Sequence, residues 1–261
     1  YGHFEGIVTP ADLLIAIAGE FASDADIGTE RAMVEREDGS LLVSGQMTAD
    51  ALAEKIGIDL PEDRDYATVA GLALDAAQRT QLAALCCLPL LEFGESGLRG
   101  WSQLIVYPNA FRVHRSHTDA AGVLHEWEDE LAGESWGAGP LILSWEDVQA
   151  DLAEPREGFC VAVHEMAHKL DALDGEMDGT PPLPREWHKR WADDFQRAYD
   201  LFCAELDAGR ETLIDAYAAE APEEFFAVAS EYHFSAPVLL RKAMPEVAAH
   251  LRRFYGPPPF L

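Results

Sequence analysis

The chain has few basic residues for its size. It carries 19 Lys and Arg against 47 Asp and Glu, which gives a formal net charge of −28. A charge of this sign and size repels phosphate backbones and anionic lipids, so direct binding to nucleic acid is not expected. Solubility is the plainest consequence of the acidity.

Cysteines and long apolar stretches are also scarce. The four cysteines include no Cys-x-x-Cys pair and are predicted to be reduced residues of the core. The longest apolar run, residues 82–91, is interrupted by Pro89 and is far shorter than the about 20 residues of a membrane-spanning helix. The first residues lack the basic start and apolar stretch of a secretory signal. We therefore expect a cytoplasmic protein without a membrane span.

The most informative segment of the chain is an apolar, helix-compatible run that contains His-Glu-x-x-His. His164 and His168 are four residues apart, so they share one face of a helix and can bind a single tetrahedral Zn²⁺. Glu165 lies beside them and is the candidate general base that acts on a water molecule. A surface helix with two chance histidines would not need apolar residues on several faces, so the zinc interpretation is favoured.

A catalytic zinc ion needs a third protein ligand and an open fourth position. The metzincin spacing would place a third histidine near Asp174, which cannot fill that role. A glutamate on a later helix, predicted to begin at Pro222, is the alternative. Glu224 ranks first, Glu231 second and Glu223 third. Glu224 and Glu231 share a face among apolar residues, where a buried carboxylate needs a metal or a cationic partner.

From residue 80 onward, strands followed by helices predict an α+β fold. Strands are expected at residues 104–107, 112–114, 123–127 and 141–143, and the second and third could pair across a polar loop at 116–122. Helices are expected at 81–91, from 145, at 155–173 and at 186–206. Gly175 would end the helix that carries the histidines. The strand at 141–143 would hold an extended peptide by edge pairing if it borders the cleft.

The first 77 residues have a different character. Helices are expected at residues 9–21, 48–56 and 66–76, and two strands within 32–43, around a turn at 37–40. YGHFEGIVTPADLL at residues 1–14 resembles the end of a cystathionine-β-synthase-type (CBS) domain. Three further stretches resemble part of the transporter-associated domain of CorC and HlyC-like proteins. They are EDGSLLVSG at 37–45, LPE at 60–62 and YATVAGL at 66–72. These likenesses predict a small partial α+β segment over residues 1–77, followed by a metallopeptidase domain over 78–261.

Most of residues 78–261 resembles the Mlc titration factor A (MtfA) family of bacterial zinc peptidases, whose catalytic domain is similar to that of anthrax lethal factor. The matching blocks are LCCLPLL at 85–91, IVYP at 105–108, SWEDV at 144–148, HEMAHKLD at 164–171, IDAYAA at 214–219, PEEFFAV at 222–228 and SEYHFSAP at 230–237. The resemblance implies a zincin-like fold in which the His-Glu-x-x-His helix carries the site.

The same resemblance implies roles for individual residues. The implied zinc ligands are His164, His168 and Glu224, and the implied general base is Glu165. Tyr217 would hydrogen-bond the oxyanion of the tetrahedral intermediate. Asp171, one helical turn beyond His168, is a further candidate, which would orient an imidazole.

The sequence therefore predicts a zinc-dependent peptidase that acts on peptide or protein substrates, with aminopeptidase-like cleavage as one form. Two hypotheses from other classes stand beside it. The protein could sequester a partner, such as the transcriptional repressor Mlc after which the family is named. It could also be an accessory module of an ion-efflux protein, a hypothesis that rests on residues 1–75 alone.

Overall fold

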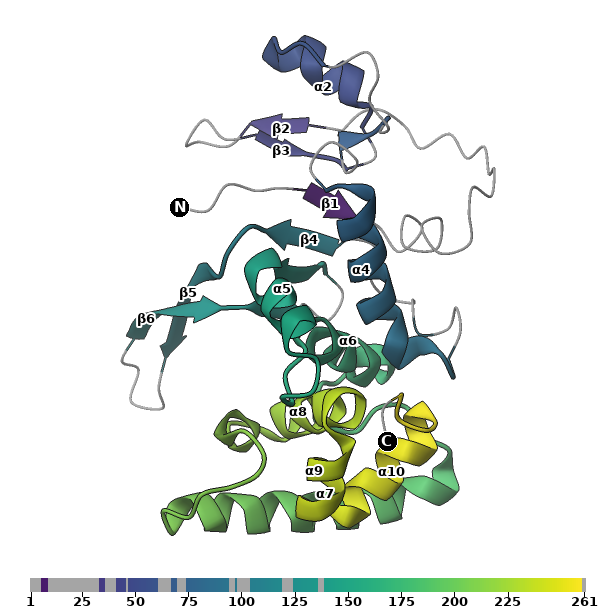
Figure 1. Cartoon of the computed structure of the whole chain (residues 1–261). Coiled ribbons are helices and arrows are strands. Elements are labelled where there is room, and N and C mark those ends of the chain that lie inside the picture. Colours follow the sequence, from purple (N-terminus) through teal and green to yellow (C-terminus); the bar gives the residue numbers. More distant parts are fainter. Residues whose placement is uncertain are drawn as a thin grey trace.

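The computed structural model shows a mixed α+β protein, as the sequence predicts (Figure 1). The N-terminal elements lie at one end of the molecule, a sheet with its helices in the middle, and the C-terminal helices at the other end. The structure describes residues 6–8, 33–35, 41–45, 47–60, 67–69, 74–93, 97, 104–118, 124–135 and 139–259.

A four-stranded sheet lies at the centre of the described fold, in the order β1-β4-β8-β7. Its strands are Gly6–Val8 (β1), Leu104–Tyr107 (β4), Leu141–Ser144 (β8) and Gly133–Ser135 (β7). β4 and β8 are parallel and lie where strands are predicted, whereas the two outer pairs are antiparallel. β8 is buried along its whole length and has a neighbour on each side, so edge pairing of a peptide with residues 141–143 is a wrong prediction. The edge strands of the described sheet are β1 and β7.

A two-stranded ribbon extends from this sheet (Figure 1). It consists of β5 (Phe111–Thr118) and β6 (Leu124–Leu131), which pair antiparallel along their whole length. The pairing predicted for residues 112–114 and 123–127 is confirmed and is longer than expected. β5 continues into residues 116–118, which were predicted to be a loop from their polarity. A two-stranded ribbon can carry polar residues on both faces because water reaches both of them.

The predicted strand pair and short helix of the N-terminal region are confirmed within the described residues. β2 (Met33–Glu35) and β3 (Leu41–Val43) form the predicted antiparallel pair, and α2 (Ala49–Ile56) is the predicted short helix. The Thr48 side chain accepts a hydrogen bond from the Ala51 amide and caps α2. A small apolar cluster joins the pair to the helix and contains Val43, Leu52 and Val69.

Two helices predicted for this region have other outcomes. The helix at residues 9–21 lies outside the described residues. The helix predicted at 66–76 does not end at Ala76 as expected. Ala76 is instead the first residue of another helix, α4 (Ala76–Cys87). Asp75 and Gln78 form a reciprocal capping box at this start, with hydrogen bonds of 2.8 Å in both directions. α4 is followed by the short turn η2 (Leu88–Leu90).

The helix that carries the two histidines is α6 (Val161–Asp171), and it starts later than the expected residue 155. The residues before it bend because Gly158 has a φ of 98°, a left-handed conformation that a right-handed helix does not contain. The short turn η4 (Ala172–Asp174) follows, and Gly175 ends it with a φ of 111°, as predicted. All residues of α6 after the first are buried. The prediction of a buried helix is therefore confirmed.

The C-terminal third of the chain is helical. Its helices are α7 (Arg185–Asp207), α8 (Pro222–Ser235), α9 (Pro237–Ala243) and α10 (Pro245–Tyr255). α7 matches its predicted range within one residue at each end, and its aromatic stripe is buried in the core, as expected; the stripe includes Trp187, Trp191, Phe195 and Phe202. α8 lies between α6 and the other C-terminal helices (Figure 1). This position brings the acidic first turn of α8 to the histidines.

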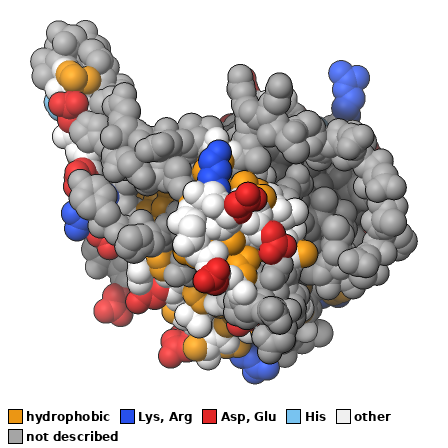
Figure 2. Space-filling view, turned by 90° about the horizontal axis from the view of Figure 1, so that it is seen from above, with side chains coloured by type: hydrophobic (Ala, Val, Ile, Leu, Met, Phe, Trp, Pro, Cys, Tyr) orange, Lys and Arg blue, Asp and Glu red, His pale blue; other side chains and the backbone are white. Residues whose placement is uncertain are grey.

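All four cysteines are free, in agreement with the expected reduced state. Cys86 and Cys160 are buried, whereas Cys87 and Cys203 are only partly so. On the face shown in Figure 2, the described acidic side chains are spread over several elements and outnumber the basic ones. Within the described ranges, no helix has the length and apolar character needed to cross a membrane.

Candidate metal centre

His164 and His168 face one another from successive turns of α6. Their Nε2 atoms are 3.2 Å apart, and only 9% of His164 and 6% of His168 is exposed. Two neutral imidazoles with both Nε2 lone pairs turned to one point would repel each other. The arrangement therefore favours a cation between the two rings.

Glu224 completes the cluster from the first turn of α8. Its Oε2 atom lies 3.0 Å from Nε2 of His164 and 3.5 Å from Nε2 of His168. Pro222 occupies the first position of α8, where a missing N–H is tolerated, and so sets the helix phase that turns Glu224 toward α6. One ligand atom from each of the three residues lies within 4.8 Å of the others.

The spacing of these three atoms fits a metal ion. A tetrahedral zinc ion with bonds of about 2.0–2.1 Å keeps its ligand atoms roughly 3.3 Å apart. The observed separations of 3.0, 3.2 and 3.5 Å bracket that value. Two imidazole nitrogens and one carboxylate oxygen are also a donor set that zinc commonly takes.

The pKa shifts of His164 and Glu224 also favour a positive charge between these residues. Burial lowers the pKa of His164, but hydrogen bonds to Glu224 and Glu231 outweigh it and leave that pKa well above its ordinary value. Burial raises the pKa of Glu224, but hydrogen bonds to the two histidines hold it well below its usual range. The cluster therefore favours positive charge at its centre, supplied by a proton or by a metal ion.

Glu231 lies on the other side of His164. Its Oε1 atom is 2.8 Å from Nδ1 of His164, and its Oε2 atom accepts from the Cys160 amide at 2.6 Å. A carboxylate at this position keeps the proton on Nδ1, so that the Nε2 lone pair points into the cluster. Glu231, which the sequence ranks second as a zinc ligand, therefore lies behind His164 and orients its ring. Glu223, ranked third, lies outside the cluster.

Glu165 is buried beside the cluster, with 4% of its surface exposed, and its Oε2 atom has no hydrogen-bond partner within the described part of the chain. Burial raises its pKa to about 7, with a further increase from Glu224 and Glu231, while the two histidines lower it. The positive charge of a metal ion would lower this pKa further. A bound metal ion would thus keep Glu165 in the carboxylate form, which can accept a proton.

Gly133, the first residue of β7, lies against the Glu165 carboxylate. A Cβ atom on Gly133 would be 2.5 Å from Oε1, 2.7 Å from Cγ and 2.9 Å from Cδ of Glu165. Atoms cannot approach so closely, and the backbone of β7, which is paired with β8, moves less readily than a side chain. Any larger residue at position 133 would therefore displace Glu165. Sequence reasoning missed this contact.

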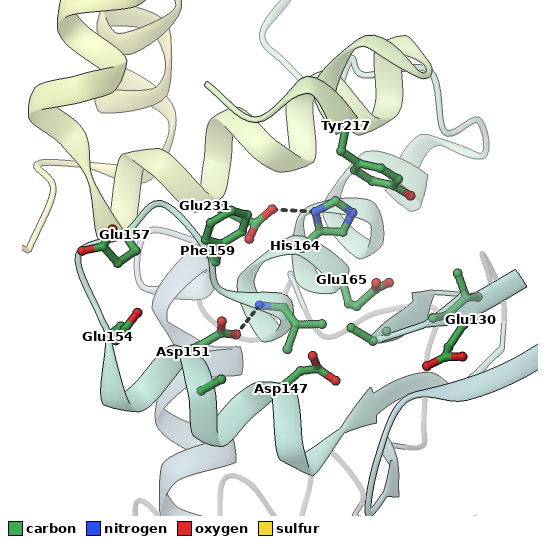
Figure 3. A pocket seen from close by; sticks show the side chains of 15 residues that line it. Glu130, Asp147, Asp151, Glu154, Glu157, Phe159, His164, Glu165, Tyr217 and Glu231 are labelled. Atoms are coloured by element: carbon green, nitrogen blue, oxygen red, sulfur yellow. Dashed lines mark hydrogen bonds and ion pairs between the residues drawn. The ribbon is translucent and has the colours of Figure 1, made fainter. Parts of the chain in front are cut away.

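Tyr217 lies in the short turn η5 (Ala216–Ala219), where Asp215 accepts a hydrogen bond from its amide. Its ring centroid is 5.9 Å from that of His164, and 43% of the residue is exposed. Burial and the nearby Glu224 carboxylate raise the pKa of its phenol. The phenol therefore keeps its proton at neutral pH and can donate a hydrogen bond at the rim of the cluster, where Figure 3 shows it beside His164.

Asp171 has a different partner from the predicted one. Its Oδ2 atom accepts a hydrogen bond of 2.8 Å from the Gly179 amide, and its Oδ1 atom has no partner within the described ranges. Gly179 in turn packs closely against the backbone of Pro222. Asp171 thus ties the loop after α6 to the start of α8. The role of orienting an imidazole belongs to Glu231 instead.

A cavity of about 460 Å³ opens beside the cluster (Figure 3). One wall comes from the ends of β6 and β7 and another from α5 (Trp145–Ala153). His164, Glu165 and Tyr217 line its inner end. A substrate bound in the cavity would therefore meet the cluster directly.

Comparisons with known proteins agree with this chemistry. A family model described as glucose-regulated metallo-peptidase M90 matches residues 45–256. Proteins called Mlc titration factor A, from Yersinia pestis (strain Pestoides F) and Yersinia pseudotuberculosis (serotype O:1b, strain IP 31758), are each 37% identical to the chain over 207 residues. The aligned part is 78% of this chain and 76% of each relative. The family match begins at residue 45 and so includes part of the segment 1–77.

Proposed function

The chain belongs to the M90 family of glucose-regulated metallo-peptidases, and we propose that it hydrolyses peptide bonds with a zinc ion held by His164, His168 and Glu224. The family implies a metal-dependent peptidase. The observation that carries the finer proposal is the convergence of three buried or half-buried ligand atoms within 4.8 Å, beside a buried carboxylate.

Zinc, when bound, would polarise the scissile carbonyl and acidify a water molecule. Glu165 would accept a proton from that water and pass it to the leaving amine. Its buried position beside the cluster and its unpartnered Oε2 atom suit both steps. Tyr217 would donate its phenol proton in a hydrogen bond to the oxyanion.

The edge strand β7 is the proposed guide for the substrate backbone. It has one strand neighbour in the described sheet, β8, and its first residue contacts Glu165. An extended peptide that pairs with the edge strand of a sheet gains main-chain hydrogen bonds without a sequence requirement. Such pairing would carry a scissile bond past Glu165. Aminopeptidase-like cleavage is one form of this reaction, and substrates with free or acetylated amino termini would identify it.

Replacement of Glu165 by glutamine tests the proposal. Glu165→Gln should retain zinc, because the three ligands are unchanged, and should lose at least about 100-fold in kcat, the usual contribution of a general base. Metal content by mass spectrometry and hydrolysis of a peptide reporter panel give the two readouts. Glu146→Gln, on the outer face of α5, is the matched control and should behave as the parent does. A Glu165→Gln variant with full activity, or a parent protein that takes up no zinc, would overturn the proposal.

A second candidate function rests on the relatives, whose name describes titration of Mlc. We propose that this chain, too, binds a transcriptional repressor protein. Under this hypothesis the repressor would be retained by the immobilised protein with and without a chelator. Loss of capture on removal of zinc would instead mean that the metal site takes part in binding. The ion-efflux hypothesis gains no support from the family match or the relatives, and it is not carried further.

A further inference from the structure

The cavity beside the cluster is lined almost entirely by acidic and apolar residues. Of its 15 lining residues none is Lys or Arg. Seven are carboxylic acids: Glu130, Asp147, Asp151, Glu154, Glu157, Glu165 and Glu231. The cavity is therefore a strongly negative space that begins at the reactive groups.

Two of these carboxylates are held by hydrogen bonds within the chain. Asp151 accepts from the Val161 amide at 2.8 Å, and Glu231 is engaged by His164 and Cys160. Four others, Glu130, Asp147, Glu154 and Glu157, have weak or no cationic partners among the described residues. Glu130 has the exposed Arg112 at 3.7 Å, and no ion pair is found among the described residues for Asp147, Glu154 or Glu157. Glu165 is 96% buried, lines the same space and has an oxygen without a partner.

Three of the acids form a row along one face of α5. Asp147 and Asp151 lie in α5, and Glu154, the residue that caps its C-terminus, continues their i, i+4, i+7 spacing. Like charges at such spacings destabilise a helix. Burial raises the pKa of Asp151 to about 6, and Glu231 and Asp147 contribute to the increase. Asp147 gains from the dipole at the first turn of α5, and Asp151 accepts from the start of α6, but neither role requires a third carboxylate at Glu154.

We propose that this cavity receives a cationic side chain, lysine or arginine, of the peptide substrate, so that the protein cleaves next to basic residues. The inference rests on the proposed peptidase function and names its substrate class. In Figure 3 the Asp147 carboxylate points from α5 into the space in front of Glu165, with Glu130 across from it. A basic side chain bound there would lie beside the scissile bond.

The shape of the cavity favours a long side chain over an α-amino group or a metal ion. The row on α5 extends over about 10 Å, at 1.5 Å per residue, which is further than one α-amino group reaches. Phe159, Val161 and Leu131 supply apolar walls for the methylene stem that lysine and arginine bury. Within the described residues, the three ligands His164, His168 and Glu224 are the one group close enough to hold a metal ion.

Paired peptide substrates test the proposal on the full, zinc-loaded chain. Arginine or lysine, and their neutral counterparts citrulline or norleucine, are placed at each position near the scissile bond, with free and with acetylated amino termini. Cationic side chains should give a kcat/KM about tenfold higher at one position, or ~1.4 kcal/mol. The preference should fall as salt rises, because the charges are partly exposed.

Variants locate the source of the preference. The double variant Asp147→Asn, Glu154→Gln should reduce the tenfold preference to about two- or threefold. Glu146→Gln removes the same kind of charge next to Asp147 but outside the cavity and should leave the preference intact. An equal loss in Glu146→Gln would mean that the overall charge, not the cavity, attracts the substrate, and would overturn the inference.

The remaining outcomes separate this inference from the proposed function. If neutral substrates are cleaved as fast as cationic ones, the proposed peptidase function stands and the inference of a basic preference is overturned. A preference that disappears on acetylation shows that an α-amino group is bound, which also overturns it. Absence of any cleavage overturns the proposed function and the inference together. A readout independent of turnover is the affinity of Glu165→Gln for an arginine peptide, which should exceed its affinity for the citrulline peptide about tenfold.

Discussion

Glu231 holds His164 from the side of the ring that faces away from Glu224. It contacts both the imidazole Nδ1 atom and the Cys160 amide that precedes α6. One carboxylate thus fixes the tautomer of a ligand and the start of the helix that carries it. This makes Glu231 a positioning residue, whose effect passes through His164.

Replacing Glu231 by alanine should weaken zinc binding by roughly 10- to 100-fold, the usual effect of losing a residue that supports a metal ligand. Glu231→Gln keeps an oxygen that can accept one of the two hydrogen bonds and should rescue part of the affinity. Competition with a chromophoric chelator measures the affinity, and circular dichroism checks the fold. Glu223→Ala, on the same helix, is the control that should bind zinc like the parent. An unchanged affinity in Glu231→Ala would rule out the role.

At this scale the sequence predicts only part of the candidate site. The spacing of His164 and His168 is enough to bring them together, because both lie on one helix. Glu224 and Glu231 are seven residues apart on one face of α8, and only the packing of α8 on α6 decides which of them reaches Nε2. Gly133 carries no spacing signal at all, because its contact joins a strand to a distant helix.

At the scale of elements, α5 holds a carboxylate whose charged form the fold disfavours. Burial, partly offset by the hydrogen bond from the Val161 amide, raises the pKa of Asp151 from 3.8 to about 6, and Glu231 and Asp147 add to the increase. An acid whose pKa is higher in the folded chain favours folding in its protonated form. Stability is therefore lost as the pH rises from about 4 to about 6.

Asp151→Asn should thus stabilise the protein at pH 8, by about 1–2 kcal/mol once solvent screening is allowed for. The gain should be smaller at pH 4.5, where the folded parent is already mostly protonated. Asparagine keeps the oxygen that accepts from Val161. Urea unfolding at both pH values, at constant zinc concentration, measures the difference, with Glu146→Gln as the control. Equal stability of Asp151→Asn and the parent at pH 8 would contradict this account.

Elements with strong patterns are the ones that the sequence predicts well. The apolar run of β4 and the aromatic spacing of α7 identify both elements closely. β7 is missed because three residues, Gly133–Ser135, show no alternation of apolar and polar positions. The late start of α6 depends on the left-handed conformation of Gly158, which packs against the Tyr232 ring. That conformation follows from tertiary packing and leaves no local signal.

At the scale of the whole molecule, the boundary between residues 1–77 and 78–261 stays a prediction. Three observations bear on it. β1, from the first segment, pairs with β4 of the central sheet, Leu74 is fully buried in the main core, and Asp75 caps α4. The family match also begins at residue 45. The two predicted parts thus share a sheet and a core.

Truncation tests how far the second part depends on the first. A chain of residues 78–261 should be less stable than one of residues 74–261 by roughly 3 kcal/mol, the sum of a lost helix cap and a lost buried leucine. Chemical unfolding of the two truncated chains and of the full chain gives these differences. Because both truncated chains lack β1, their comparison isolates residues 74–77, which include Leu74, Asp75 and the first two residues of α4. A chain of residues 78–261 as stable as the full protein would instead support an independent domain.

Gly133 offers a way to classify related genes. A larger residue there would push the Glu165 side chain aside but would contact none of the three ligands. A relative that keeps His-Glu-x-x-His and the distant glutamate but has a larger residue at this position would then be a pseudoenzyme, folded and metal-loaded yet inert. In such a protein the intact motif would wrongly suggest an active enzyme. The residue at the position of Gly133, on strand β7, would indicate that the activity is lost.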